Sequence, residues 1–230
     1  MLRVASYNVR GLRDDRAALI RVVAAARPDV LCVQEAPRFA SWRARRRRLA
    51  HRAGMTVAAG GRAGGVAVFA GPAVRVLHGS GHPLRRYAGL EWRAAAVAVV
   101  EKEGARYAVC CAHLDLVAGA RLRHATEVVA VLDGTARVFG AAPVLAADVN
   151  EEPDGPAWRY LARRWADCFA VAPRGDGRTF PAARPSMRID GVFAGPGLEV
   201  LSCGGVAGVP AADLAAASDH LPVIADLRPR

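Results

Sequence analysis

Lysine is almost absent from this basic chain. Lys102 is the only lysine, although Lys and Arg together number 32 against 21 Asp and Glu, so arginine carries the formal net charge of +11. Such a charge is typical of proteins that bind polyanions, nucleic acid among them. The sequence is also rich in alanine, and a bias in codon composition would raise arginine and alanine together. Charge alone therefore leaves nucleic-acid binding and compositional bias as even alternatives.

Long apolar runs are missing as well. No stretch approaches the roughly eighteen uncharged apolar residues that a membrane-spanning helix requires. The chain begins at Met1 to Arg3 and leads directly into a strand-like segment, where a signal peptide would have an apolar region. We therefore expect a cytoplasmic protein with no membrane span, and no feature indicates a protein partner.

The sequence lacks a Cys-x-x-Cys pair, the spacing typical of zinc and redox sites. It has five cysteines, an odd number, and Cys32, Cys110 and Cys111 lie in strand-like runs. Neighbouring residues of a strand point to opposite faces, so a disulfide between Cys110 and Cys111 is not expected. The pattern favours reduced, structural thiols.

Neither an internal repeat nor a long linker divides the chain. Its 230 residues, 53% of them hydrophobic, are enough for one domain with a sizeable core. Short strand-like runs alternate with segments of helical periodicity, which predicts mixed sheets with helices on their outer faces. We expect an α/β (α+β) fold and a single domain over residues 1–230.

Three main helices are predicted. The first is capped by Asp14 or Asp15 and ends before Pro28, the second spans about 37–53, and the third about 117–137. In the third helix, the spacing places Leu122, Ala125, Val129 and Leu132 on the buried face and Arg121, Arg123, His124 and Glu127 off it. Short strands are predicted at 66–69, 74–77 and 93–100, and a surface loop at 173–185.

Six apolar stretches each run into polar groups. The stretches cover residues 4–8, 30–35, 109–113, 143–150, 188–190 and 218–220, and their polar groups are Asn8, Glu35, His113, Asp148, Asn150, Asp190, Asp219 and His220. Polar side chains at the ends of buried strands are where α/β sheets place ligand chemistry. We expect one cleft, with a hard metal cation and a phosphate as its candidate ligands.

Taken singly, the carboxylate and amide motifs are ambiguous. Asp148 and Asn150 are two apart, so an extended backbone would place both side chains on one face, but the same residues also suit a turn. Glu35 could bind a divalent cation or favour the N-terminus of the next helix. Asn8 lies shortly before Arg10-Gly11, so it could equally belong to a turn.

His113 and His220 are more informative, because the chain has six histidines and each of these two has an acid close by in the sequence. A histidine next to an acid favours general acid–base catalysis near neutral pH. Asp190 begins an apolar strand and needs a partner there, either an imidazole or a buried arginine.

An arginine run follows Glu35 at residues 43–48. One interpretation is a solvated helix face. The other is a contact site for a phosphate backbone, in which arginine supplies affinity independent of base sequence. Under the second interpretation the substrate-binding residues are Arg45, Arg46, Arg47 and Arg48.

In their order along the chain, these motifs resemble the endonuclease/exonuclease/phosphatase superfamily (deoxyribonuclease I-like), from Ser6-Tyr7-Asn8 to Ser218-Asp219-His220. The resemblance implies a four-layered α/β/β/α sandwich with two mixed β-sheets packed face to face. Two residues depart from the family pattern. Ala147 stands where glycine commonly precedes the catalytic aspartate, and Gly191 where an aromatic residue often follows Ile-Asp. Neither change removes a reacting group.

The resemblance also implies a cofactor and its ligands. It makes Glu35 the principal Mg²⁺ ligand, with Asn8 and Asp219 nearby in the metal site and with Mn²⁺ able to substitute.

It further implies roles for the remaining residues. Asp148 would orient or deprotonate the attacking water, and Asn150 would hold a phosphate oxygen. His220, oriented by Asp190, would act as general base or transition-state stabiliser, while His113 would donate to the phosphate or to the leaving oxygen.

The implied activity is that of a divalent-metal-dependent phosphoesterase. We expect a phosphodiesterase of the nuclease type, hydrolysing nucleic acid by metal-assisted attack of water. The alternative within the enzyme class is a phosphatase or phosphodiesterase acting on a small phosphorylated metabolite or a lipid head group. A catalytically silent binding protein of the same fold is the third interpretation, and the intact set of polar residues disfavours it.

Overall fold

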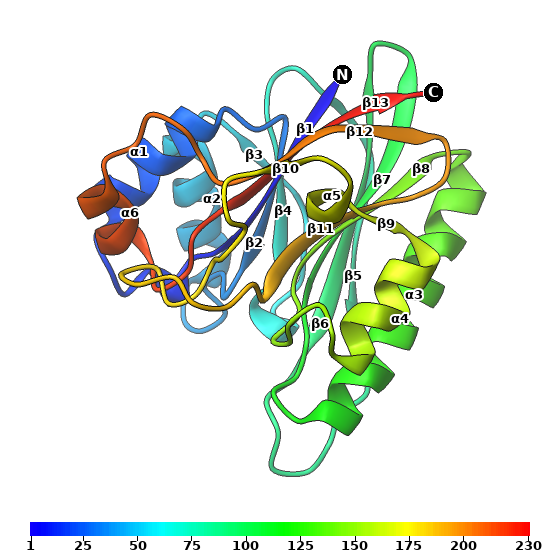
Figure 1. Ribbon diagram of the computed structural model, residues 1–230, viewed down its shortest axis with the longest axis horizontal. Helices are drawn as coiled ribbons and strands as arrows, with labels where there is room; N and C mark the ends of the chain where they lie inside the picture. Colours follow the sequence, from blue (N-terminus) through cyan, green and yellow to red (C-terminus); the bar gives the residue numbers. More distant parts are fainter.

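Two mixed β-sheets lie face to face in this computed structural model, which describes residues 1–230 (Figure 1). The larger sheet has seven strands, in spatial order β10 (Pro173–Arg174), β12 (Leu198–Gly204), β13 (Val223–Pro229), β1 (Leu2–Asn8), β2 (Val30–Gln34), β4 (Ala67–Ala70) and β3 (Thr56–Ala59). The smaller has six, in the order β5 (Arg75–Pro83), β6 (Ala94–Lys102), β7 (Ala105–His113), β8 (Ala142–Asp148), β11 (Asp190–Ala194) and β9 (Ala166–Asp167).

A parallel pair lies inside each sheet. β1 runs parallel to β2, and β7 runs parallel to β8, whereas β13 and β11 pair antiparallel with β1 and β8. Parallel neighbours end at the same edge of a sheet, so the polar residues that follow them are brought together. β1 and β13, which come from opposite ends of the chain, are also neighbours, with Leu2 opposite Leu227.

Helices cover the outer face of each sheet (Figure 1). α1 (Arg16–Ala26), α2 (Trp42–Arg52) and α6 (Ala211–Ala217) pack on the larger sheet, and α3 (Ala118–Phe139) and α4 (Pro156–Arg164) on the smaller. The short α5 (Cys168–Val171) follows β9, and 3-10 turns occupy Arg10–Leu12 and Ala63–Gly65. The predicted α/β/β/α sandwich is confirmed. None of these helices combines the length and the apolar character needed to cross a bilayer.

Successive side chains of the central strands enter different hydrophobic cores. In β6, Ala96 and Ala98 belong to the core between the sheets, while Val97 and Val99 belong to the core under α3, where Leu132 also packs. Successive side chains of a strand point to opposite faces, so a strand buried on both sides must be apolar throughout. This explains the continuous apolar runs of the sequence. All five cysteines are buried and unpaired.

The predicted buried face of α3 is partly wrong. Ala125, Val129 and Leu132 are buried as expected, but Leu122 is 36% exposed, whereas Arg121 and His124 are buried. The Arg121 guanidinium is accommodated because it donates to the carbonyl oxygens of Asp115, Leu116 and Asn150 and to the carboxylate of Glu151. A buried arginine with enough acceptors can thus replace an apolar residue on the inner face of a helix.

The second helix starts later than predicted, at Trp42 instead of residue 37. Ser41, just before it, has a φ of 56°, in the left-handed region where a helix cannot continue. The segment 37–41 is a loop, and the carbonyl oxygen of Pro37 in it accepts a hydrogen bond from Nε of Arg46 at 2.8 Å.

Arg46 is one of the largest fully buried side chains of the protein, with 1% of its surface exposed. Besides Pro37, it donates from Nη1 to the carbonyl oxygens of Gly61 at 2.9 Å and Val66 at 3.0 Å. Burial lowers the pKa of this guanidinium to about 10. The prediction that Arg46 binds substrate is therefore corrected, because its Nε and Nη1 donate to loops of the fold and its Nη2 is buried.

Replacing Arg46 by methionine should destabilise the protein, since three buried carbonyl oxygens lose their donor. We expect the free energy of unfolding to fall by about 2–4 kcal/mol, measured by urea denaturation. Arg47→Met, on the exposed face of the same helix, should change it by less than about 0.5 kcal/mol. Equal effects of the two substitutions would contradict a structural role for Arg46.

Candidate active site

Three polar residues lie in a row at one edge of the smaller sheet. In the strand register, His113 at the end of β7 is opposite Asp148 at the end of β8, and Asp148 is opposite Asp190 at the start of β11. All three are buried. Their approach follows from strand pairing alone, because residues paired across neighbouring strands stand about 5 Å apart.

Two more residues come from the larger sheet. Asn8 ends β1 and is paired in register with Gln34, and Glu35 follows immediately with a φ of 49°. The Asn8 amide donates from Nδ2 to Oε1 of Glu35 at 3.2 Å and to Oδ2 of Asp148 at 2.9 Å. The second of these bonds joins the edges of the two sheets.

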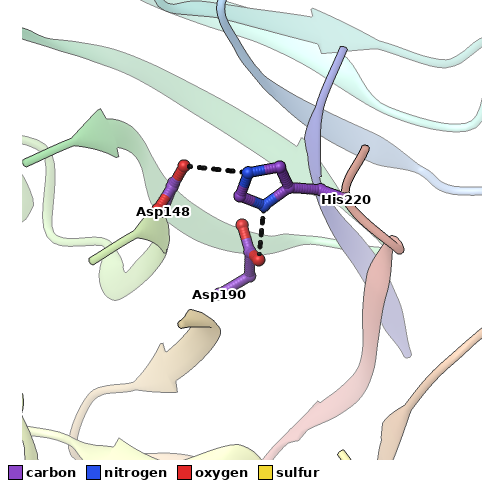
Figure 2. A group of neighbouring side chains, drawn as sticks. All are labelled: Asp148, Asp190 and His220. Atoms are coloured by element: carbon purple, nitrogen blue, oxygen red, sulfur yellow. Dashed lines mark hydrogen bonds and ion pairs between the residues drawn. The ribbon is translucent and has the colours of Figure 1, made fainter. Parts of the chain in front are cut away.

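His220 reaches the same place from the loop between α6 and β13. Figure 2 shows its ring between Asp148 and Asp190, with Nδ1 at 2.8 Å from Oδ2 of Asp190 and Nε2 at 3.8 Å from Oδ2 of Asp148. The ring packs against Phe180, with centroids 4.9 Å apart. The loop itself is fixed by Ser218, whose hydroxyl donates to the carbonyl oxygen of Asn8 at 2.7 Å.

Oδ2 of Asp148 is the centre of this arrangement. It accepts from Asn8, and the Nε2 atoms of His113 and His220 lie 3.4 and 3.8 Å away. Burial raises the pKa of Asp148, and the neighbouring imidazoles and the Asn8 amide oppose that rise. A carboxylate surrounded by donors on one side and open to a cleft on the other can hold a water molecule in a fixed orientation.

The two histidines have opposite pKa shifts. Burial disfavours the charged form of both rings. For His220 the charge and hydrogen bond of Asp190 outweigh burial and raise the pKa to about 9, whereas burial dominates at His113 and lowers its pKa to about 4. Two chemically identical groups thus have different protonation states in one site, which is a common property of active sites.

The structure places Asn150 and Asp219 differently from the rest. Asn150 has a φ of 55°, so it is not part of an extended strand with Asp148, and its Nδ2 donates to the carbonyl oxygen of Leu114 at 3.0 Å. The expected sharing of one strand face is therefore wrong, although Asn150 still lines the cleft. Asp219 pairs with Nε of Arg10 at 3.2 Å.

A cleft of about 500 Å³ opens above these groups. Of the predicted set, its lining includes Glu35, His113, Asp148, Asn150 and His220. Asn8 and Asp190 are each 1% exposed and lie beneath the surface. Within the arginine run, Arg45 lines the cleft, while Arg47 and Arg48 are exposed on α2 outside it.

Sequence reasoning missed three arginines of this cleft: Arg13, Arg38 and Arg93. Arg38 pairs with Glu91 at 2.7 Å. Arg93 is 9% exposed and stands immediately before the apolar strand β6. Arg93 could have been predicted from the sequence, because a charged residue next to an apolar strand indicates a site residue. The same signal indicated Asp190.

The residues present fit a hard divalent cation. Such ions take oxygen ligands, and the carboxylates of Glu35 and Asp148 converge on one amide nitrogen of Asn8. Asp148, Asp190 and His220 form a second possible group, with ligand atoms within 4.8 Å of one another. In that group, however, Nδ1 of His220 is already bonded to Asp190. The carboxylates next to Asn8 are therefore the better match for an oxygen-seeking ion.

A sequence model of the Endonuclease/Exonuclease/phosphatase family matches residues 5–220. The chain belongs to this family. Its members are divalent-metal-dependent hydrolases of phosphoric esters, so the chain is an enzyme of that class. A search of curated proteins found no match.

Solved structures share the fold at low sequence identity. An endonuclease/exonuclease/phosphatase protein from Bacteroides vulgatus is 21% identical, with a TM-score of 0.81 and coverage of 100% of this chain and 99% of its own. A mannosyl-6-phosphatase from Bacteroides thetaiotaomicron is 18% identical, with a TM-score of 0.81 and coverage of 99% and 100%. The human Nocturnin catalytic domain with bound sulfate is 18% identical, with a TM-score of 0.74 and coverage of 100% and 94%.

The pairing of His220 with Asp190 can be tested by NMR titration of the histidine rings in metal-free buffer. Asp190→Asn removes the negative charge that raises the His220 pKa, so this pKa should fall from about 9 to near or below its ordinary value of about 6.5. As the pH is raised, His220 of the variant would therefore lose its proton at a lower pH than His220 of the wild-type protein. An unchanged His220 pKa in the variant would refute the proposed partner.

Proposed function

We propose that this protein is a Mg²⁺-dependent phosphodiesterase that hydrolyses nucleic acid. The observation that carries the proposal is the convergence of an amide and two imidazoles on Oδ2 of Asp148, with the carboxylates of Glu35 and Asp190 bonded to two of these groups, at the floor of a cleft with an arginine-rich rim. Hydrolysis of a phosphodiester needs a positioned water, charge neutralisation on the phosphoryl oxygens and a donor for the leaving oxygen. These groups supply all three.

Glu35 is the proposed principal ligand of the cation, with Asn8 and Asp219 close by. When bound, the ion neutralises charge on the phosphoryl oxygens. In the structure Oδ1 of Asn8 accepts from the backbone N–H of Arg10 at 3.0 Å, so its amide must turn if its oxygen is to become a ligand. Asp219 is tied to Arg10 and would act as a neighbour of the ion, not as its main ligand.

Asp148 is proposed to orient the attacking water or remove its proton, through the carboxylate oxygen on which the site converges. His220, held by Asp190, is proposed to stabilise the transition state with its Nε2–H, because the raised pKa keeps its ring protonated at neutral pH; it acts as general base only where the ring has lost its proton. His113 donates to the phosphate or to the leaving oxygen. Asn150 holds a phosphate oxygen, which requires its amide to exchange its present bond to Leu114 for the substrate.

The arginines of the cleft favour nucleic acid as the substrate. Arg13, Arg38, Arg45 and Arg93 line it, and no ion pair engages Arg13 or Arg45. A substrate with phosphates on both sides of the scissile bond would neutralise more than one of them. The second candidate is a small phosphorylated metabolite, which the name of the mannosyl-6-phosphatase neighbour suggests. Residues 1–230 as one domain and a cytoplasmic location stay predictions.

A panel assay tests the activity. Wild-type protein with Mg²⁺ should cleave at least one of plasmid DNA, single-stranded DNA, RNA or a generic phosphodiester faster than it hydrolyses sugar or inositol phosphates. EDTA should abolish cleavage, and His220→Ala and Asp148→Asn should each lower kcat/KM by at least about 10³-fold, since each removes a group that acts in the transition state.

The matched control for this assay is Asp133→Asn, an acid that pairs with Arg164 on the helical face behind the smaller sheet. It should retain the wild-type rate. Wild-type rates in the His220 and Asp148 variants would show that the site is elsewhere, and faster hydrolysis of the monoesters would favour the metabolite over nucleic acid.

The arginine run can be tested by DNA binding in EDTA over a range of salt concentrations. Arg45→Met should weaken binding and reduce the slope of log K against log salt by about one, the value for one phosphate contact. Arg47→Met is the matched control, because it removes the same charge from the same helix but lies outside the cleft. Equal slopes for the two variants would indicate a diffuse charge effect instead of a contact by Arg45.

A further inference from the structure

Two exposed aromatic side chains lie beside the active-site cleft. Phe39 is 65% exposed and Trp92 is 51% exposed, although large aromatic side chains are usually mostly buried. Both line a groove of about 690 Å³. Four residues of its lining also line the cleft: Arg38, Phe39, Gly64 and Glu91. The groove therefore continues the cleft outward from the catalytic groups.

An ion pair joins the two loops that carry these aromatic residues. Phe39 belongs to the loop 37–41, which follows β2 of the larger sheet, and Trp92 to the loop 84–93, which leads into β6 of the smaller sheet. Arg38 and Glu91 each stand one residue before an aromatic residue, and they pair at 2.7 Å. The carbonyl oxygen of Arg38 also accepts from Nε of Arg62 at 3.3 Å. Each sheet thus contributes one aromatic side chain to the groove, and their loops are tied to each other.

The Trp92 ring has room for a flat ligand. The guanidinium of Arg86 lies over the ring, 3.6 Å from its centroid. A guanidinium covers one face of an indole, and about half of the Trp92 side chain stays exposed. A second planar group can therefore stack on the remaining face, where the aromatic ring offers dispersion and a large apolar area.

The charge around the groove favours a polyanion as the occupant. Arg62 lines the groove and Arg86 lies over Trp92, and no ion pair engages either of them. Aromatic side chains interleaved with arginines are the usual platform for unpaired nucleic acid, in which bases stack and the backbone is neutralised. A lipid surface fits less well, because the two rings line a concave groove that the plane of a bilayer does not enter.

We propose that Phe39 and Trp92 stack on unpaired nucleobases of a strand whose scissile phosphate lies in the cleft. Bases of a duplex are covered on both faces by their neighbours, so only unstacked bases can use these rings. The enzyme should therefore prefer single-stranded to double-stranded nucleic acid. The inference rests on the proposed function for its catalytic part, but base binding can be measured without any turnover.

The first measurement is the binding of a short labelled oligothymidylate in EDTA, followed by fluorescence anisotropy. Phe39→Leu and Trp92→Leu should each weaken binding by about 5- to 100-fold, the loss expected for one stacked base. Phe39→Tyr and Trp92→Phe keep a ring and should bind within about threefold of wild type. Tyr160→Leu is the matched control, because it removes a partly exposed ring from α4 on the outer face of the smaller sheet. It should bind as wild type does.

Three readouts distinguish stacking from charge and from loss of the fold. The slope of log K against log salt should be the same in wild type and in the leucine variants, since no phosphate contact is lost. A strand with abasic sites in place of the thymidines should bind wild type as weakly as oligothymidylate binds the double variant Phe39→Leu/Trp92→Leu. Thermal unfolding of each variant confirms that it is folded.

Tryptophan emission reports on the contact itself. Trp158 and Trp165 are buried and Trp42 is half-buried, so Trp92 is the most accessible tryptophan. Oligothymidylate should quench the emission of the wild-type protein, and the abasic strand should not. Trp92→Phe should bind oligothymidylate without this quenching.

Turnover provides the last measurement. With Mg²⁺, kcat/KM for a single strand should exceed that for the duplex of the same sequence by at least about tenfold, and the ratio should fall towards one in the double variant. An unchanged ratio in the double variant would overturn the role of the two rings.

The outcomes separate this inference from the proposed function. Equal binding of the abasic strand and oligothymidylate overturns the inference even if the protein cleaves diesters. Quenching by a hexose phosphate but not by oligothymidylate overturns it in favour of a sugar ring, and ring-dependent sedimentation with phosphatidylserine vesicles without ring-dependent strand binding overturns it in favour of a membrane surface. Binding that depends on both the rings and the bases, in a protein that cleaves none of the panel substrates, supports the stacking site and overturns the proposed function instead.

Discussion

The face-to-face packing of the two sheets is the constraint on which the rest of the structure depends. The core between them contains residues from both sheets, such as Val4 and Val30 on one side and Val109 and Val144 on the other. This packing fixes the relative position of two edges that share no backbone hydrogen bonds. The bond from Asn8 to Asp148 then links side chains from the two edges. The polar residues of the site meet because apolar residues elsewhere determine where their strands end.

Concentrating ionisable groups in this way is unfavourable unless each has partners. Asp148 is stabilised by donors from both sheets, and Asp190 by the imidazole of His220. Charge is balanced further out by arginines, some committed to the fold and some facing the cleft. Arg121 belongs to the first kind, since it fixes the backbone of Asn150 and of Leu116 beside the site. Arg93 and Arg45 belong to the second kind and line the cleft.

The fold and the strand-end residues could be predicted from the sequence, whereas the roles of individual arginines could not. Polar groups at the ends of apolar runs carry a local signal, because burial of the run dictates their position. Arg46 gives no such signal: its acceptors on Pro37, Gly61 and Val66 belong to loops that only the folded chain brings together. The prediction of which residues lie on the buried face of α3 was partly wrong for the same reason. Leu122 is the better core residue by hydrophobicity, but the carbonyl oxygens gathered around Arg121 favour the rotation seen.

The pairing of β1 with β13 has a consequence for the order in which the candidate site assembles during folding. β1 lies inside the larger sheet, and its neighbour β13 is far from it along the sequence, with Leu2 opposite Leu227. His220 immediately precedes that strand, so it cannot reach Asp148 and Asp190 until β13 has docked. Contacts between such distant parts of a chain form slowly and late in folding. A chain that has brought Glu35, His113 and Asp148 into place before β13 docks therefore still lacks His220, so the docking of β13 completes the candidate site.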